Sequence, residues 1–242
     1  MEDDMTVEET TPDTWGRKIF EVLFLRRVSV AIIAFVLLVA ISSLPNLGVV
    51  IGWGFLLLAL LLCIRQRSFA EIGFSRPESW PRTLVSGLGL GVLLQTAFVV
   101  VIDPLAERLA GSAVDISMLD PMRGNLVNFI IMLVVGWVIG GFLEEMLFRG
   151  YLLKRLKIVF GDGPVPVATA VLLPAVAFGM AHSYQGPAGM LSTGLMGLML
   201  GVIFVLNDYN IWLPILVHGF VDMVGLTLIY LDADTWMSHL IF

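Results

Sequence analysis

Apolar residues gather into seven long runs along this chain, and most of the prolines and charges fall between them. The runs cover about residues 28–44, 47–64, 83–102, 126–148, 165–181, 188–206 and 211–231. Each is close to the roughly 20 residues that a helix needs to cross the apolar core of a bilayer. The pattern predicts an all-α, polytopic membrane protein with about seven transmembrane helices.

The segments between the runs carry weaker signals. The stretch IFEVLFL (19–25) lies between basic pairs and follows Trp15. It could form an eighth, interfacial helix at the N-terminus, and the sequence leaves this open. The linker at 68–81 predicts a turn at the cytoplasmic interface, and 103–125 is the longest predicted external loop. No internal repeat is found, so residues 15–242 are predicted to form one transmembrane domain.

Composition agrees with a membrane protein, because 58% of the residues are hydrophobic and only 14% are charged. The formal charge of −6 is local, since residues 1–14 hold six acids and no base. This segment is predicted to be an acidic, disordered tail, and it lacks the basic start of a signal peptide. The acidic balance therefore says little about partners, and no nucleic-acid partner is expected.

Lysines and arginines are distributed unevenly between the two sets of loops. If the N-terminus is cytoplasmic, only Arg108 and Arg123 of the 14 bases lie outside. The other twelve are Arg17, Lys18, Arg26, Arg27, Arg65, Arg67, Arg76, Arg82, Arg149, Lys154, Arg155 and Lys157. The external acids are Asp103, Glu107, Asp115, Asp120, Asp232 and Asp234. The positive-inside rule thus predicts a multi-pass cell-membrane protein with its N-terminus cytoplasmic and its C-terminus outside.

The candidate catalytic residues are the ionisable side chains within the predicted transmembrane helices. They are Glu144, Glu145, His182, His218 and Asp222, with Arg149 at a cytoplasmic edge. An acid at mid-membrane costs about 2.5–3.5 kcal/mol on insertion scales, so these groups are expected to converge on one polar cavity. The alternative is that each only joins neighbouring helices through hydrogen bonds. Glycine pairs with a spacing of four, Gly87/Gly91, Gly136/Gly140 and Gly197/Gly201, predict close approach of helices.

Helical spacing separates the roles of the two adjacent glutamates. Glu145 and Arg149 are four residues apart with the acid first, the favourable order for an ion pair. Glu144 points about 100° away from Glu145 on a regular helix. Arg149 is therefore predicted to fix Glu145, which leaves Glu144 free to face the cavity as a general base.

The two histidines within the helices each have a partner at the same spacing. Asp222 is predicted to hold one ring nitrogen of His218, so that the other meets substrate or water. The ring of Phe178 is predicted to pack against the imidazole of His182. The remaining histidine, His239, lies near the C-terminus and is predicted to be incidental.

Three segments together resemble the motifs of a known family. EEMLFR (144–149), FGMAH (178–182) and HGFVD (218–222) resemble the EExxxR, FxxxH and HxxxN/D motifs of the CPBP family, in family order. The family comprises CAAX prenyl proteases and Abi-type bacteriocin-processing or self-immunity proteins. The likeness spans about residues 120–230. It implies an all-helical intramembrane protease with a cavity open toward the cytosol.

The resemblance also implies roles for the motif residues. In the prenyl-protease branch, the residues matching Glu144 and His182 activate water, and those matching His218 and Asp222 stabilise the oxyanion. That branch has Asn at the last position, and an ionised Asp cannot donate to an oxyanion. Asp222 is therefore predicted to orient His218, to bind a metal, or to be protonated. The same four residues could ligate zinc or act without a metal, so glutamate-type and metallo-type catalysis both stay open.

The favoured prediction is an endopeptidase in the lipid bilayer that hydrolyses a peptide bond in a peptide or lipidated protein tail. One alternative is a non-catalytic scaffold of the same fold that binds a partner protein. Another is a proton-coupled transporter. The complete motif set disfavours the scaffold, and the lack of a repeat disfavours the transporter.

Overall fold

The computed structural model of the protein describes residues 14–234, and within them it contains helices and no strand. The acidic tail, up to residue 13, and His239 lie outside the described residues. Helix α1 already begins at Thr14, the last residue of the predicted tail. The prediction of an all-α chain is confirmed for the part that the structure describes.

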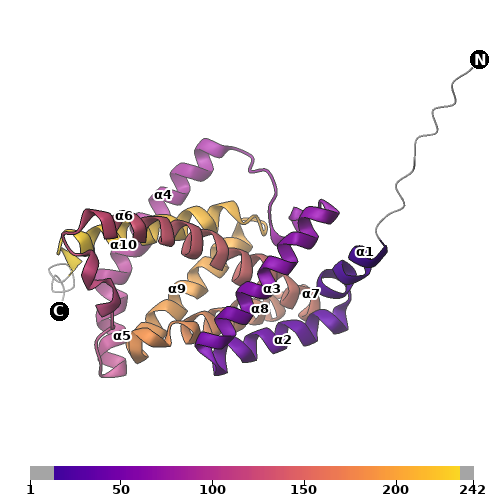
Figure 1. The fold of residues 1–242 in the computed structure, drawn as a ribbon, viewed down its shortest axis with the longest axis horizontal. Coiled ribbons are helices and arrows are strands. Elements are labelled where there is room, and N and C mark those ends of the chain that lie inside the picture. Colours follow the sequence, from indigo (N-terminus) through magenta and orange to yellow (C-terminus); the bar gives the residue numbers. More distant parts are fainter. Residues whose placement is uncertain (1–13, 235–242) are drawn as a thin grey trace, which may run out of the picture.

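The helical elements follow one another with short connections (Figure 1). In chain order they are α1 (Thr14–Phe20), η1 (Glu21–Leu25), α2 (Arg27–Ser43), α3 (Pro45–Gln66), η2 (Phe69–Ile72), α4 (Trp80–Ala97), η3 (Phe98–Ile102), α5 (Asp103–Ala110), η4 (Ser117–Met122), α6 (Leu126–Val135), η5 (Gly136–Glu144), η6 (Met146–Leu153), α7 (Lys154–Phe160), α8 (Pro164–Ala181), η7 (Ser183–Gln185), α9 (Gly186–Leu206) and α10 (Trp212–Tyr230).

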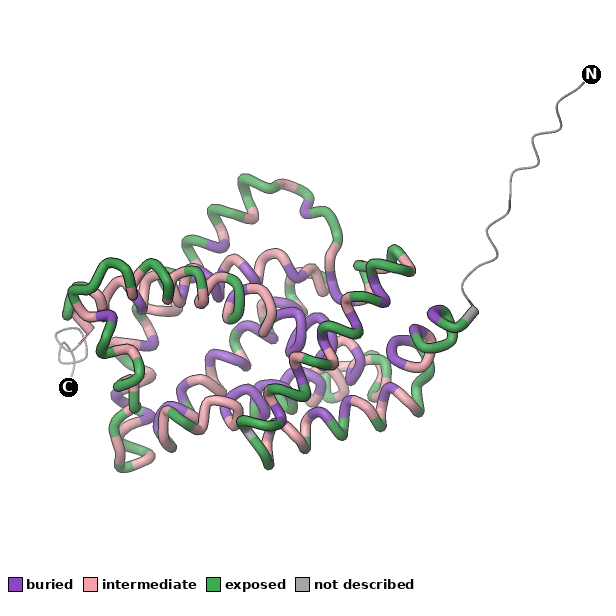
Figure 2. Tube along the Cα trace, in the orientation of Figure 1, coloured by how far each residue is buried: buried purple, intermediate pink, exposed green. Residues whose placement is uncertain are grey.

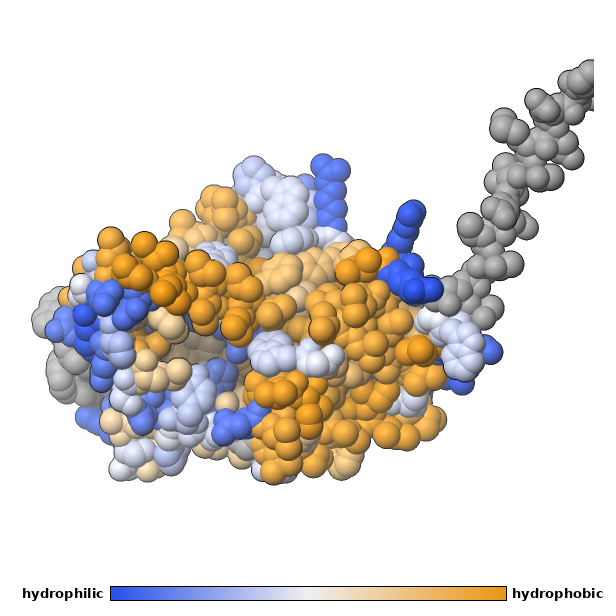
Figure 3. All heavy atoms as spheres, viewed as in Figure 1, coloured by the Kyte–Doolittle hydropathy of each residue, from blue (hydrophilic) through white to orange (hydrophobic). Residues whose placement is uncertain are grey.

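The helices have the length and composition of a multi-pass membrane protein. Among the described residues, six helices are long and apolar enough to cross a bilayer, and a bent pair makes up to seven. The bent pair joins Trp15–Leu25 to Arg27–Ser43 at 69°. Residues 19–25 are thus helical and turn sharply before α2, a geometry that suits the interfacial alternative. Apolar side chains cover most of the surface in Figure 3, as contact with lipid requires.

Two predicted boundaries were wrong, and for the same reason. Residues 103–110 belong to the helix that starts at Trp80, so the third apolar helix runs to Ala110 and the predicted external loop is shorter. The fourth helix continues from Leu126 to Phe160. In both cases the helix continues past the apolar run, through Pro104 in the third helix and through Arg149 in the fourth, and apolar periodicity alone could not indicate where the helix ends.

The bundle has two chemically different ends, at the right and left of Figure 1. The basic end comprises residues 21–27, 65–82, 154–163 and 207–212. Its segments are joined by hydrogen bonds, for example from the Ile211 amide to the Gly73 carbonyl at 2.9 Å. The acidic end comprises residues 103–124, 182–186 and 230–234. There the amide of Asp115 donates to the carbonyl of Gln185 at 2.9 Å.

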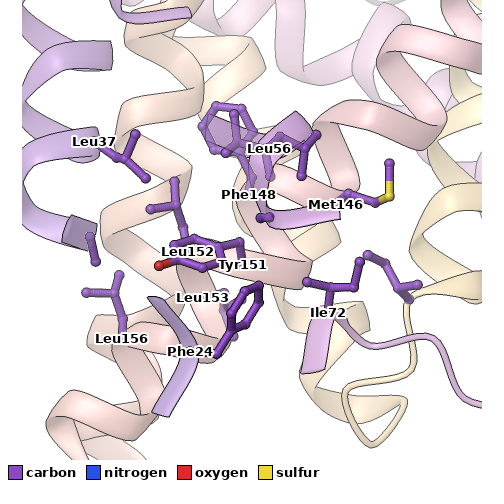
Figure 4. Close-up of a cluster of buried hydrophobic side chains, with 14 of the residues drawn as sticks. Phe24, Leu37, Leu56, Ile72, Met146, Phe148, Tyr151, Leu152, Leu153 and Leu156 are labelled. Atoms are coloured by element: carbon purple, nitrogen blue, oxygen red, sulfur yellow. The ribbon is translucent and has the colours of Figure 1, made fainter. Parts of the chain in front are cut away.

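The largest apolar core lies next to the basic end and closes it. Every residue from Met146 to Leu153 is buried, Arg149 included. Figure 4 labels five apolar side chains of this segment near Phe24, Leu56 and Ile72, which come from three other elements. Figure 2 shows the same contrast along the chain, with buried positions inside and exposed ones on the outer helices. No comparable plug of large apolar side chains covers the acidic end within the described residues.

The predicted glycine pairs do lie where helices touch. A Cβ on Gly87 would come 2.6 Å from Cβ of Leu216, and one on Gly91 would come 2.5 Å from Cβ of Phe220. Both contacts join α4 to α10. Gly136 and Gly140 face Asp222 in the same way. These close approaches bring α10 and its polar side chains against its neighbours.

Replacement of Gly91 by alanine is expected to lower the free energy of unfolding by about 1–3 kcal/mol, because the methyl group overpacks the α4–α10 contact. Gly89 is the matched control, since a Cβ there meets nothing within 4 Å. Alanine at that site is expected to be neutral or stabilising, because alanine favours helix. The measurement is the midpoint of thermal unfolding in detergent. Equal losses in both variants would contradict the packing argument.

Candidate active site

The long helix from Leu126 to Phe160 carries both glutamates at a point where it is not a regular α-helix. Gly136–Glu144 and Met146–Leu153 are π-helical, and Glu145 lies between these two segments. A π-helix holds more residues per turn than an α-helix, and π segments are frequent at functional sites. The side-chain directions expected from a regular helix therefore hold only approximately here.

Glu145 is the centre of a buried polar network. Its side chain is 0% exposed, and its Oε1 accepts from the guanidinium of Arg149 at 2.7 Å. The ion pair indicated by the spacing is thus present. The same oxygen is 2.8 Å from Nδ1 of His218, 73 residues away. Arg149 also donates to the carbonyl of Gly197 at 2.9 Å, which ties the network to α9.

One prediction about this network was wrong, and another holds only in part. Arg149 does not lie at a cytoplasmic edge, because its side chain is only 2% exposed and sits in the core. Asp222 contacts His218 at ion-pair distance only, because its Oδ1 is 3.7 Å from Nε2, too far for a hydrogen bond. Glu145 holds His218 instead, through Nδ1. Sequence spacing suggested the partner on the same helix, while packing of η5 and η6 against α10 supplied a closer one.

Phe178 packs against both histidines of the site and against Arg149. Its ring centroid is 4.7 Å from that of His182 and 6.0 Å from that of His218. The guanidinium carbon of Arg149 lies 5.0 Å from the ring centroid of Phe178. The Phe178 ring thus separates the buried Glu145–Arg149 ion pair from His182. It packs against the His182 ring, as the spacing of the two residues in the sequence predicted.

The ring of His182 has a defined proton position when it is neutral. Its Nδ1 is 2.8 Å from the carbonyl oxygen of Phe178. A carbonyl can only accept, so Nδ1 carries the proton and Nε2 keeps a free lone pair. By the same argument, Nδ1 of His218 donates to the carboxylate of Glu145. In each ring, Nε2 is the nitrogen that remains for water or substrate.

A cavity of about 400 Å³ brings the four candidate catalytic residues together. Glu144, His182, His218 and Asp222 all line it, so helices far apart in the sequence meet at one cavity, whose other lining residues are mainly apolar. Glu144 makes no hydrogen bond within the described part of the chain, whereas Glu145 lies behind the wall. The structure thus agrees with a division of labour between the two carboxylates, and their catalytic roles stay predictions.

A second, smaller cavity of about 160 Å³ adjoins this site. Glu144, His182 and Tyr184 line both cavities. The rest of the smaller cavity is mainly apolar, with Trp53, Leu147 and others from α2, α3 and η6. An extended chain in the larger cavity could therefore insert an apolar side chain next to Glu144.

Several lining residues were missed by sequence reasoning. Tyr184 is 51% exposed, its ring centroid is 5.6 Å from that of His182, and its hydroxyl is a candidate donor. Gln95 is a polar residue inside an apolar helix, a signal that could have been used. Asp103 accepts a hydrogen bond from the hydroxyl of Ser192 in the cavity wall. Nothing in the sequence pattern indicated that this last pair would meet.

The space beside His218 and Asp222 depends on a glycine. A Cβ on Gly140 would collide with Oδ2 of Asp222 and lie 3.5 Å from Nε2 of His218. Replacement of Gly140 by alanine is therefore expected to lower the rate of any reaction at this site by about tenfold to a hundredfold, through misplaced side chains. The readout is turnover at saturating substrate, with Gly54→Ala as control because a Cβ at Gly54 meets nothing within 4 Å. An unchanged rate would show that this space is not used.

The predicted zinc ligands do not fit a metal site in their present arrangement. Nδ1 of each histidine is held by Glu145 or by a backbone carbonyl, so only Nε2 of each ring could ligate an ion. Within residues 14–234, no three His, Cys, Asp or Glu side chains are arranged to hold one ion. No chemical step below is therefore routed through a metal.

Two expectations from the sequence cannot both hold. The cavity is lined at its outer part by Asp115, Met118 and Gln185, all at the acidic end. Asp115 and Met118 are exposed there. With a cytoplasmic N-terminus the acidic end faces outward, yet the resemblance implied a cavity that opens toward the cytosol.

The comparisons with known proteins agree with the motifs. Residues 126–224 match the family described as type II CAAX prenyl endopeptidase Rce1-like, a segment that contains all three motifs and the four lining residues above. No curated protein gave a significant match. No solved structure did so either. The match of this segment supports the CPBP/CAAX protease family that the motifs resemble.

Proposed function

We propose that the protein is an intramembrane endopeptidase in which Glu144 and His182 activate a water molecule for attack on a peptide bond. The observation that carries the proposal is that Glu144, without a hydrogen-bond partner in the described chain, shares one cavity with the Nε2 atoms of two oriented imidazoles. The family match gives the general class, a protease that acts on a peptide or lipidated protein in the membrane. The catalytic type and the residue roles are our own inference.

Water activation requires a base that can reach a water in the cavity. The carboxylate of Glu144 accepts the proton of the attacking water, and Nε2 of His182 accepts a hydrogen bond from the same water. The carbonyl of Phe178 fixes the His182 tautomer, so the free lone pair points away from the helix that carries it. The proton taken by Glu144 then passes to the leaving amine, and the base is regenerated.

The developing oxyanion requires a donor on the other side of the carbonyl. A doubly protonated His218 supplies one from Nε2, since its Nδ1 is held by the buried carboxylate of Glu145. Asp222, at 3.7 Å from this nitrogen, is close enough to keep the proton there before substrate binds. The hydroxyl of Tyr184 is the second donor within the cavity wall. Glu145 and Arg149 act as positioning residues, because they fix His218 and lie outside the cavity.

Purified protein in proteoliposomes, incubated with a mixture of peptides, tests this function. Mass spectrometry of the mixture is expected to reveal new internal cleavage products that require the protein. Their absence, with peptide bound and unchanged, would favour a non-catalytic scaffold. A pH-dependent ion flux without cleavage would favour a transporter. Either result would contradict the proposal.

A further inference from the structure

We infer that Gln95 is a substrate-binding residue, whose carboxamide binds a backbone peptide unit of the substrate about three residues from the bond that is cleaved. The inference rests on the function proposed above, because it assigns one more contact to the same cavity. It follows from the unused hydrogen-bonding groups of Gln95, from the place of its amide over Gly225, and from the distance between that place and His218.

The hydrogen-bonding groups of Gln95 are not used by the fold. Three polar side chains that line the cavity make no hydrogen bond within the described chain, namely Gln95, Glu144 and Asp222. Every other polar side chain of the lining has at least one hydrogen bond, as Asp103 has with Ser192. Glu144 and Asp222 belong to the family motifs, and Gln95 does not. The cavity wall therefore offers one neutral amide that the proposed mechanism leaves without a role.

The position of Gln95 within an apolar helix points to a ligand. Gln95 belongs to α4 and to the candidate membrane span Trp80–Ala110. A polar side chain inside a bilayer either joins neighbouring helices by a hydrogen bond or lines a path for a substrate. Gln95 bonds to no other helix of the described chain, and it lines the cavity, so the second explanation applies. A carboxamide carries both a donor and an acceptor, as a peptide unit does, and the two groups are complementary.

Packing of α4 against α10 determines where the amide lies (Figure 1). Gly87 and Gly91 bring the two helices together, and Gln95 follows them on α4 at the same spacing of four. A Cβ on Gly225 of α10 would lie 2.9 Å from Nε2 and 3.4 Å from Cδ of Gln95. The missing side chain of Gly225 thus leaves the room that the carboxamide occupies, and the amide lies directly over α10.

The distance of the amide from the catalytic centre follows from the rise of α10. His218, Asp222 and Gly225 are at positions i, i+4 and i+7 of this helix, so they share one face, and all three line the cavity. At 1.5 Å per residue, Gly225 lies about 10 Å from His218 along the axis. An extended peptide advances about 3.3 Å per residue. A substrate whose scissile carbonyl meets Nε2 of His218 therefore passes Gln95 with a peptide unit about three residues away.

Replacement of Gln95 by leucine, which is similar in size and has no hydrogen-bonding group, tests the contact. The substrate is a peptide that the wild-type protein cleaves in proteoliposomes and that extends well past the cleaved bond on both sides. KM is expected to rise about tenfold, while kcat changes by less than about twofold. Thr96→Val is the matched control, because Thr96 is exposed and its hydroxyl donates to the carbonyl of Val92 on the same helix. An unchanged KM in Gln95→Leu, or an equal rise in the control, would overturn the inference.

Shortened peptides separate a direct contact from an effect on the fold. The peptide is cut back one residue at a time from each end, toward the cleaved bond. Truncation on one side is expected to abolish the difference in KM between the wild-type protein and Gln95→Leu, because the peptide unit that Gln95 binds is gone. A difference that persists with every shortened peptide would mean that the substitution acts through the fold, which would overturn the inference.

Replacement of Gly225 by alanine tests the place of the amide without removing it. The methyl group meets the end of a flexible side chain, so the protein is expected to fold while the carboxamide of Gln95 is displaced. KM is expected to rise as in Gln95→Leu, with the same dependence on peptide length. A wild-type KM in Gly225→Ala would contradict the position of the contact over α10.

Binding measurements keep this inference apart from the proposed function. In the Glu144→Gln background, the dissociation constant of the tightest-binding peptide of the mixture is expected to rise about tenfold when Gln95→Leu is added. If the wild-type protein cleaves no peptide but binds one with this dependence on Gln95, only the proposed function is refuted. If peptides are cleaved without any dependence on Gln95, only the inference is refuted. If no peptide binds, both are refuted.

Discussion

Replacement of Glu144 by glutamine is expected to lower the rate of peptide hydrolysis by about 10²–10⁴-fold while the protein stays folded. Glutamine has nearly the same shape but cannot take a proton from water. The fold should tolerate it, because Glu144 makes no hydrogen bond within residues 14–234 and faces the cavity. The measurement is kcat/KM on a peptide that the wild-type protein cleaves, together with the midpoint of thermal unfolding.

The matched control is Glu78→Gln, the same chemical change at an exposed position of the basic end. It is expected to leave both the rate and the unfolding temperature unchanged. Full activity of Glu144→Gln would show that Glu144 is not the general base, whatever roles the other residues have. Loss of activity together with loss of the fold would instead mean that Glu144 has a structural role, against the arrangement in the cavity.

Removal of the Arg149 guanidinium by Arg149→Met is expected to destabilise the protein by about 3–5 kcal/mol, because it breaks the buried ion pair with Glu145. Glu145 is 0% exposed and its Oε2 has no hydrogen-bond partner among the described residues, so Oε1 carries the whole network. The hydrogen bond to the carbonyl of Gly197 is lost as well. Thermal unfolding in detergent measures the effect.

A double variant separates charge from packing. Arg149→Met combined with Glu145→Gln removes both charges, and it is expected to recover a large part of the lost stability, since buried ion pairs are often replaceable by neutral groups. Activity should not return, because His218 no longer faces a carboxylate at Nδ1. Arg76→Met, at an exposed site, is the control for the loss of an arginine. If the double variant were no more stable than the single one, the charge of Glu145 would not be the cause.

Much of the local structure could be predicted from the sequence, because the bilayer leaves the backbone few choices. Apolar runs of the right length must be helices when lipid offers no hydrogen bonds, so the seven runs indicated the architecture. The pair of Glu145 and Arg149 could be predicted for a related reason, since its geometry lies within one helix. The ends of the third and fourth helices could not be predicted in this way, because a helix can continue into polar residues as readily as it ends there.

Contacts between helices were less predictable. Spacing assigned Asp222 to His218, yet the structure gives that role to Glu145, because the π-helical segments and the close approach at Gly140 and Gly141 turn Glu145 toward α10. The pairing of Asp103 with Ser192 likewise joins helices whose order in the sequence says nothing about their contact. Such contacts depend on crossing angles and on the rotation of each helix about its axis.

The sequence by itself therefore determined that this protein is a helical membrane protein with three polar motifs, through periodicity and the limits that lipid sets on the backbone. Only the tertiary structure decided that Glu144, both histidines and Asp222 line one cavity, that Glu145 holds His218, and that the cavity meets solvent at the acidic end. The physical reason is that these features arise where helices distant in sequence pack together, and packing depends on the shapes of all the facing side chains at once.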